Sequence, residues 1–237
     1  MGKRVSWERN GPSTGRGRLG RSLLGLLLAS HVSLCLAVSG SGTHNYVFVI
    51  DTSSSMVTNR LLAPLRVAVD DYADTIPLDG SSRLWIYTFD RGLRSSEFFP
   101  EKGALDSYAK LLAAKVHLNR LEAKGSDTHV YASLDRVLSD VRRILEKDGS
   151  QDFVIHLFTD GEDRGPRKPT VEDVAGKFSL LRDEHAGELE FYYHSLKVAV
   201  RGKAGRILGE TPGMHVVSSV RIPPQARFTP SQIRTVP

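Results

Sequence analysis

The chain has 237 residues and a formal net charge of +5, from 32 Lys and Arg residues against 27 Asp and Glu residues. Its length suits one domain with short additions. The excess charge lies in residues 1–39, where the charged residues are Lys3, Arg4, Arg9, Arg16, Arg18, Arg21 and Glu8. Subtracting these from the totals leaves 26 basic and 26 acidic residues, so we expect no nucleic-acid partner.

The basic start leads into an apolar segment, residues 23–38, which small residues follow. This order is typical of a secretory signal peptide, so we expect cleavage after Ser39 and an exported domain, periplasmic or extracellular. The alternative is an uncleaved signal anchor that attaches the protein to a membrane through residues 23–38. The single cysteine, Cys35, lies inside this leader, and Leu34 before it disfavours lipidation. The exported domain therefore has no disulfide.

Continuous apolar runs alternate with apolar residues at helical spacing along the rest of the chain. Strands are predicted at 46–50, 84–89, 94–99, 153–158, 188–196 and 214–219. Helices are predicted over 61–76, 105–112, 130–144 and 171–181. Strands without alternation are buried on both faces, so the pattern predicts a doubly wound α/β fold with a mostly parallel sheet of about six strands. We expect the domain over 44–220 and an extended, proline-containing tail over 221–237.

Polar side chains gather where the predicted strands end. Ligands bind outside the carboxyl ends of parallel strands in such folds, so these side chains should converge on one edge of the sheet. Two carboxylates and three hydroxyls are hard oxygen ligands of the kind that suit Mg²⁺ or Mn²⁺. The predicted metal ligands are Asp51, Ser53, Ser55, Thr128 and Asp160.

Each part of this set also has a simpler interpretation. Residues 51–55 are typical of a helix cap or a turn, Thr128 of a helix cap, and Asp160 followed by Gly161 of a turn. Thr52 and Ser54 are expected to be outward-facing spacers between the ligands.

Together the segments resemble the von Willebrand factor type A (vWA) domain. That family's metal-ion-dependent adhesion site has the pattern Asp-x-Ser-x-Ser, a distant Thr and a distant Asp, which "DTSSS" at 51–55, Thr128 and Asp160 match. The resemblance covers about residues 44–220. It implies that the two serines bind the metal directly, and that Thr128 and both aspartates bind it directly or through water. Ser54 and Asp127 depart from glycines that are common in the family, and Asp127 adds a carboxylate near the rim.

The resemblance implies a non-catalytic module for cell adhesion or protein binding, in which the metal accepts an Asp or Glu from a protein partner. One alternative is a Mg²⁺-dependent hydrolase, which needs a base beside the metal. His129, Asp127 and Glu162 are the candidates for that base. Another alternative is a membrane-anchored subunit of a larger envelope assembly. His156, in the middle of a predicted strand, is expected to be a buried core histidine.

Overall fold

The computed structural model describes residues 42–95, 104–161, 163–197, 202–224 and 228. Contacts divide the chain into two units, Met1–Gly40 and Ser41–Pro237, and every described residue belongs to the second. The predicted leader, residues 1–39, lies outside the described residues, so the signal peptide and the anchor stay predictions. Within the described ranges, no helix is long and apolar enough to cross a membrane.

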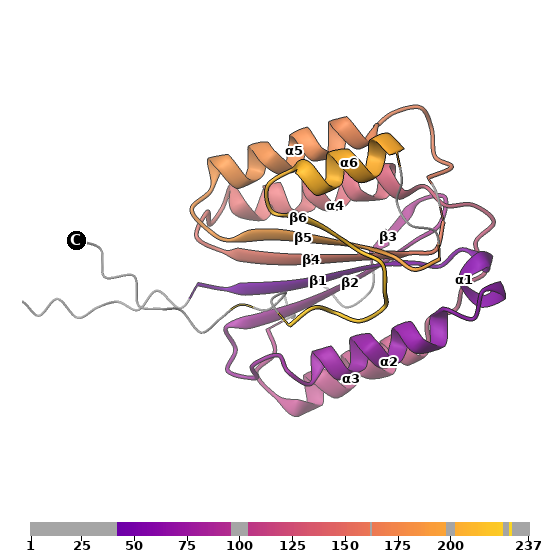
Figure 1. Ribbon diagram of the computed structural model, residues 1–237. Coiled ribbons are helices and arrows are strands. Elements are labelled where there is room, and N and C mark those ends of the chain that lie inside the picture. Colours follow the sequence, from indigo (N-terminus) through magenta and orange to yellow (C-terminus); the bar gives the residue numbers. More distant parts are fainter. Residues whose placement is uncertain (1–41, 96–103, 162, 198–201, 225–227, 229–237) are drawn as a thin grey trace, which may run out of the picture. The chain divides into compact units, whose positions relative to one another are not determined.

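In the part of the chain that the structure describes, six strands form one sheet in the order β3-β2-β1-β4-β5-β6 (Figure 1). Their bounds are β1 His44–Asp51, β2 Ser82–Phe89, β3 Leu93–Ser95, β4 Asp152–Thr159, β5 Leu189–Ser195 and β6 Met214–Val217. Of these six described strands, only β3 runs antiparallel to its neighbour. Ile50 lies opposite Thr88 of β2 and Phe158 of β4, so these three strands end at the same edge. The structure confirms the predicted α/β fold with a mostly parallel sheet.

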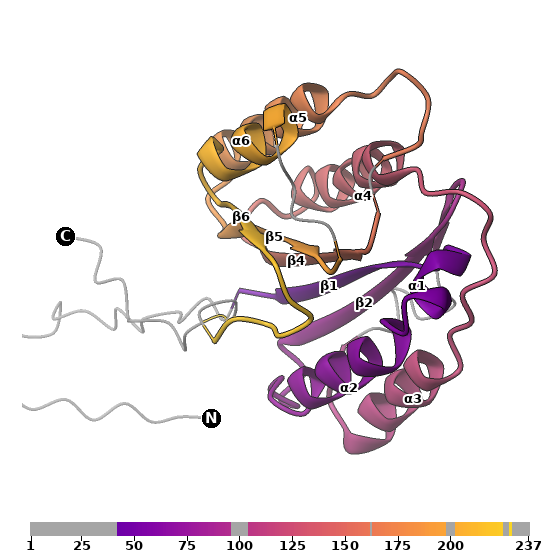
Figure 2. The ribbon, with the colours of Figure 1, turned by 45° about the vertical axis from the view of Figure 1, so that its right-hand side comes forward.

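Helices cover both faces of the sheet (Figures 1 and 2). Their bounds are α1 Ser54–Thr58, α2 Leu62–Ala73, α3 Tyr108–Asn119, α4 Val130–Leu145, α5 Val171–Glu184 and α6 Gly202–Glu210. Alternate residues of β1 enter two separate cores, because successive strand side chains point to opposite faces. Val47 and Val49 belong to the core under α4 and α5, whereas Phe48 and Ile50 belong to the core under α2 and α3.

The observed elements differ from the predicted ones mainly at their ends. The predicted helix 61–76 is α2, and a short α1 precedes it because the chain turns at Arg60, which has a φ of 56°. The predicted helix 105–112 begins later, at Tyr108, and continues to Asn119. Leu105 is buried, but it lies before the helix and bonds to the backbone of Ser82.

Three further differences concern the outer parts of the sheet. The predicted strand 94–99 corresponds to β3, Leu93–Ser95, and residues 96–99 lie outside the described residues. The helix α6 was not predicted. The last strand, β6, ends at Val217 rather than at residue 219.

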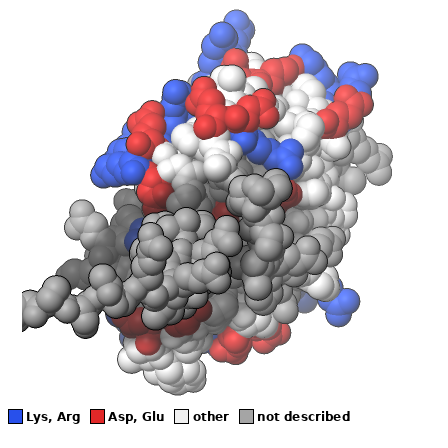
Figure 3. Space-filling model, turned by 90° about the vertical axis from the view of Figure 1, so that its left-hand side faces the viewer, with Lys and Arg blue, Asp and Glu red and all other residues white. Residues whose placement is uncertain are grey.

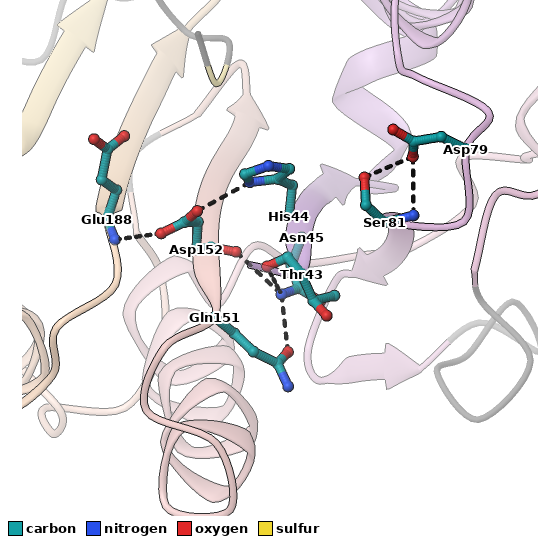
Figure 4. A network of polar contacts seen from close by, with 8 residues as sticks. All are labelled: Thr43, His44, Asn45, Asp79, Ser81, Gln151, Asp152 and Glu188. Carbon is teal, nitrogen blue, oxygen red and sulfur yellow. Dashed lines mark hydrogen bonds and ion pairs between the residues drawn. The ribbon is translucent and has the colours of Figure 1, made fainter. Parts of the chain in front are cut away.

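A buried polar network joins the amino ends of β1 and β4 (Figure 4). The side-chain amide of Asn45, which is fully buried, donates to Gln151 Oε1 at 3.1 Å and to the carbonyl of Asp152 at 3.0 Å. Asn45 Oδ1 accepts a hydrogen bond from Trp85 Nε1 at 3.1 Å. Because buried polar groups are costly when unpaired, this network fixes the register of three neighbouring strands. It lies at the edge of the sheet opposite to the carboxyl ends.

The surface on that side of the molecule carries both signs of charge. Figure 3 shows Lys and Arg side chains interspersed with Asp and Glu side chains over the described residues. This mixture on one face agrees with the balanced charge of residues 40–237.

The chain after β6 returns to the face that α2 and α3 cover. Val217, Val220, Ile222 and Phe228 pack against the core on that face. The ring of Phe228 stacks on His44 with a centroid distance of 4.7 Å. Two residues of the predicted tail, Ile222 and Phe228, therefore contribute to the folded unit.

Candidate metal centre

The first predicted ligands lie where β1 passes into α1. Asp51 is the last residue of β1, and its Oδ1 accepts a hydrogen bond from the backbone N–H of Ser53 at 2.8 Å. Ser53 occupies the N-cap position of α1, but its side chain makes no capping hydrogen bond. Its hydroxyl lies instead 2.9 Å from the hydroxyl of Ser55. The helix-cap interpretation thus describes the position of Ser53 but not what its side chain does.

Asp160 joins this pair from the end of β4. Its Oδ1 accepts a hydrogen bond from the Ser55 hydroxyl at 2.7 Å. Three oxygens, from Ser53, Ser55 and Asp160, therefore form a short chain of hydrogen-bonded neighbours. Such a cluster arises because β1 and β4 are neighbours and parallel, so both strands deliver their following residues to one edge.

Thr128 approaches the same place from the loop before α4. The N-cap of α4 is His129, so Thr128 does not hold the capping position that the simpler interpretation gave it. A Cβ on Gly161 would lie 3.9 Å from Thr128 Oγ1, which places this hydroxyl beside the residue that follows Asp160. Thr128 is buried, with 5% of its surface exposed.

Backbone hydrogen bonds attach the loop that carries Thr128 to the end of β1. The backbone N–H of Gly125 donates to the Thr52 carbonyl at 3.0 Å, and the N–H of Ser54 donates to the Gly125 carbonyl at 2.7 Å. Only glycine fits at this point, because a Cβ on Gly125 would come within 2.3 Å of the Cβ of Asp90. The position of Thr128 therefore depends on a close backbone approach that no side chain can enter.

One expectation about the spacers was wrong. Ser54 is exposed, as predicted, but Thr52 has only 5% of its surface exposed. The hydroxyl of Thr52 donates to the carbonyl of Phe89 at 2.9 Å. Thr52 faces inward because its backbone N–H and its hydroxyl both donate to the carbonyl of Phe89, the last residue of β2.

The converging residues surround a hollow of about 340 Å³. Four of the five predicted ligands line it: Ser53, Ser55, Thr128 and Asp160. The fifth, Asp51, is fully buried behind them and does not line the hollow. Its Oδ2 accepts a hydrogen bond from Thr159 Oγ1 at 2.6 Å. The structure thus brings all five to one edge of the sheet, with Asp51 in a supporting position.

Burial raises the pKa of the Asp51 carboxyl, hydrogen bonds from Thr159 and Ser53 oppose this rise, and the negative charge of Asp160 adds to it. Among the described residues, no Lys or Arg forms an ion pair with Asp51 or Asp160. A charge that is buried without a partner is unfavourable, so this pair of carboxylates suits a cation bound in the adjoining hollow.

The donor set fits a hard divalent ion. Hydroxyl and carboxylate oxygens are the donors that Mg²⁺ and Mn²⁺ prefer, and Mg²⁺ is commonly held by one or two carboxylates and several waters. Within the described ranges, no group of three or more His, Cys, Asp or Glu side chains is placed to hold a metal. A site rich in imidazole or thiolate is therefore not found there, and the serine and threonine hydroxyls would have to complete the coordination.

Among the described residues, the rim of the hollow carries four charged side chains, from Asp127, Asp163, Arg164 and Lys197. Asp127 Oδ2 lies 3.5 Å from His129 Nε2 and 4.0 Å from Arg91. Asp163 Oδ1 accepts a hydrogen bond from the backbone N–H of Tyr131 at 3.2 Å. Of the three candidate bases for a hydrolase, Asp127 and His129 thus face each other, and Glu162 lies outside the described residues.

Asn59 and Lys197, which connect to Asp160, were not predicted from the sequence. Asn59 donates from its side-chain amide to Asp160 Oδ2, and Lys197 donates to Asn59 Oδ1 at 2.8 Å. A signal for each was present. Asn59 follows Ser55 by one helical turn, and Lys197 comes shortly after β5, whose carboxyl end lies at the same edge of the sheet.

Comparison with solved structures identifies the fold. No protein-family model matches the sequence, and no curated protein matches it. A von Willebrand factor type A protein from Catenulispora acidiphila superposes with a TM-score of 0.56 and 21% identity, over 76% of this chain and 39% of that one. The chain therefore has a vWA-like α/β fold, as its residues predicted.

Two other structures of this fold have informative names. Proximal thread matrix protein 1 from the mussel byssus, solved with a zinc-occupied metal-ion-dependent adhesion site, gives a TM-score of 0.51 at 19% identity, over 76% of this chain and 42% of that one. The pilus adhesin SpaC from Lactobacillus rhamnosus GG gives 0.51 at 15% identity, over 75% and 28%. The chain spans less than half of the length of each of these three proteins.

Proposed function

We propose that the protein is a binding module that holds a divalent cation, Mg²⁺ or Mn²⁺, and captures a carboxylate of a protein partner through it. The observation that carries this proposal is the cluster of Ser53, Ser55 and Asp160 oxygens, with spacings of 2.9 and 2.7 Å, in a hollow beside Thr128. When bound, the cation would supply an electrophilic centre with free coordination positions for an outside ligand.

The residues of the chain have distinct tasks in this proposal. Ser53, Ser55, Thr128 and Asp160 line the hollow and would hold the cation, directly or through water. Asp51 would act from behind, because it fixes the Ser53 backbone and accepts from Thr159. Because the other donors are neutral hydroxyls, the ion would stay electrophilic at its open side, where an anionic ligand from outside would bind.

The solved structures of similar fold suggest the kind of role that such a binding module could have. An adhesin and a matrix protein share the fold, and a metal occupies the corresponding kind of site in the matrix protein. We extend to this chain the role of an adhesion or interaction module without catalysis. The predicted leader, residues 1–39, would export the module, which would then be either free or held in a membrane by the apolar segment 23–38.

Capture of partners with and without a chelator tests the proposal. The immobilised full chain should retain one or more proteins in Mg²⁺ and release them in EDTA, and the Asp160→Asn variant should retain none of them. Asp183→Asn, which removes an exposed carboxylate from α5, is the matched control and should behave as the wild type. Retention that neither EDTA nor Asp160→Asn changes would refute a cation-dependent mode of binding.

A further inference from the structure

Lys197 is linked to the candidate metal centre through one amide. Its Nζ donates to Asn59 Oδ1 at 2.8 Å, and Asn59 Nδ2 donates to Asp160 Oδ2. The other carboxylate oxygen of Asp160 accepts from Ser55. Lys197 and Asn59 both line the hollow, and the hydrogen bond to Asn59 holds the exposed ammonium group at its edge.

The chemistry of the three groups determines which atom donates and which accepts in each of these hydrogen bonds. An ammonium group only donates and an ionised carboxylate only accepts, so the Asn59 amide must turn its oxygen to Lys197 and its nitrogen to Asp160. The amide therefore separates the two charges while it joins them. Among the described residues, Lys197 has no ion pair with Asp160, and its positive charge stays available at the edge of the hollow.

The other charges of the rim differ in availability. Asp127 contacts His129 and Arg91, and Asp163 accepts from the Tyr131 backbone, so both acids have partners. Arg164 and Lys197 are exposed side chains that line the same hollow. An incoming anion would therefore meet two exposed basic groups on the rim, whereas the two rim acids already contact groups of this chain.

We propose that Lys197 couples the cation to the anionic ligand, weakening the binding of the cation alone and strengthening its binding once a carboxylate is present. This inference rests on the proposed function. Like charges repel, so the ammonium opposes a divalent ion in the same hollow. A carboxylate between them is attracted by both, and one of its oxygens would contact the cation while the other contacts Lys197.

Thermodynamic coupling makes the two affinities depend on each other by the same factor. If a carboxylate raises the affinity for the cation, the cation raises the affinity for the carboxylate by the same factor. The module would then engage its partner and its metal together. Lys197 is in this account a specificity-determining residue, which selects a ligand that can bridge the cation and the ammonium.

Titration of the full chain with Mn²⁺ tests the coupling, in chloride and in acetate at equal ionic strength. In wild-type protein, acetate should strengthen Mn²⁺ binding. Lys197→Gln should bind Mn²⁺ in chloride about two- to fivefold more tightly, the size of effect that one partly exposed charge has on another. It should also lose most of the strengthening by acetate, and Lys197→Arg should retain it.

Lys147→Gln is the matched control. Lys147 lies just beyond the far end of α4, a helix of 16 residues and hence about 24 Å long, whose other end adjoins the site. This variant should match the wild type in both salts. If wild-type protein binds Mn²⁺ and Lys197→Gln shows the same affinity and the same acetate effect, the coupling role is wrong and the proposed function stands. If wild-type protein binds no Mn²⁺ in either salt, the proposed function fails and the coupling fails with it.

Discussion

The hydroxyl of Ser55 donates a 2.7 Å hydrogen bond to Oδ1 of Asp160, a residue 105 positions further along the chain. This contact joins the segment after β1 to the segment after β4 at the carboxyl edge of the sheet. It is a direct link between the two halves of the candidate metal centre. Cation binding should therefore depend on this contact and on the groups that support it.

Ser55→Ala should weaken Mn²⁺ binding on the order of tenfold, because it removes a hydroxyl that both contacts Ser53 and orients Asp160. Ser54→Ala changes the adjacent, exposed hydroxyl and should leave the affinity unchanged. Calorimetric titration of both variants beside the wild type measures the difference. Equal losses in the two variants would show that the effect comes from the local backbone and not from a ligand hydroxyl.

Gly125→Ala should lower the free energy of unfolding by about 1–3 kcal/mol, because the added Cβ would come within 2.3 Å of the Asp90 Cβ. The loop must then move away from the end of β1, so cation binding should weaken as well. Chemical denaturation and Mn²⁺ titration check the two effects. Gly92→Ala, where an added Cβ meets nothing within 4 Å, should change neither by a measurable amount. A Gly125→Ala variant as stable as Gly92→Ala would contradict this packing argument.

Two buried histidines predict how stability depends on pH. His156 Nδ1 lies 3.1 Å from His194 Nε2, and His194 Nδ1 lies 2.9 Å from the carbonyl of Ser219. A carbonyl only accepts, so His194 donates from Nδ1. In its neutral form His194 then accepts at Nε2 from His156 Nδ1. Both are fully buried, as the sequence predicted for His156. Burial lowers the pKa of His194 to about 4, which the hydrogen bond to Ser219 opposes, and burial together with His194 lowers the pKa of His156.

The sign of the effect follows from these shifts. In the unfolded chain a histidine has a pKa of about 6.5. Below that pH the unfolded state therefore binds more protons than the folded state does. Stability from His194 is complete above about pH 6.5 and is lost as the pH falls towards about 4, by an amount on the order of 3 kcal/mol.

Denaturation from about pH 7.5 to about pH 4.5 in EDTA measures this slope. His194→Gln should flatten it, because glutamine can donate to the Ser219 carbonyl but does not titrate. His185→Gln, at the C-cap of α5, should leave the slope close to that of the wild type. The histidine account fails if His194→Gln and wild-type protein lose stability in parallel.

The strands were the most predictable part of the fold. Residues 46–50 and 153–158 are apolar almost without interruption because β1 and β4 lie inside a parallel sheet covered on both faces. The helix α6 was missed because Gly202, Gly205 and Gly209 lower its helix propensity, and packing against the sheet outweighs that propensity. The break between α1 and α2 at Arg60 could not be predicted, because a residue with positive φ is usually glycine or asparagine rather than arginine.

The residues of the site could be predicted because the carboxyl ends of parallel strands lie at one edge of the sheet. The sequence did not distinguish Asp160, which lines the hollow, from Asp51, which lies behind it and accepts a hydrogen bond from Thr159. It could place Asn59 and Lys197 near this edge of the sheet, but it did not predict the hydrogen bonds that join Lys197 through Asn59 to Asp160. Such a link depends on side-chain positions that no local pattern encodes.

The most direct measurement is calorimetric titration of the full chain with Mn²⁺, comparing wild type, Asp160→Asn and Asp183→Asn. Asp160→Asn removes a carboxylate charge that lines the hollow, and asparagine keeps nearly the same shape. We expect wild type and Asp183→Asn to bind one ion per chain with equal affinity, and Asp160→Asn to bind at least about tenfold more weakly. Equal heats for all three proteins, or no heat for any of them, would contradict a cation site at Ser53, Ser55, Thr128 and Asp160.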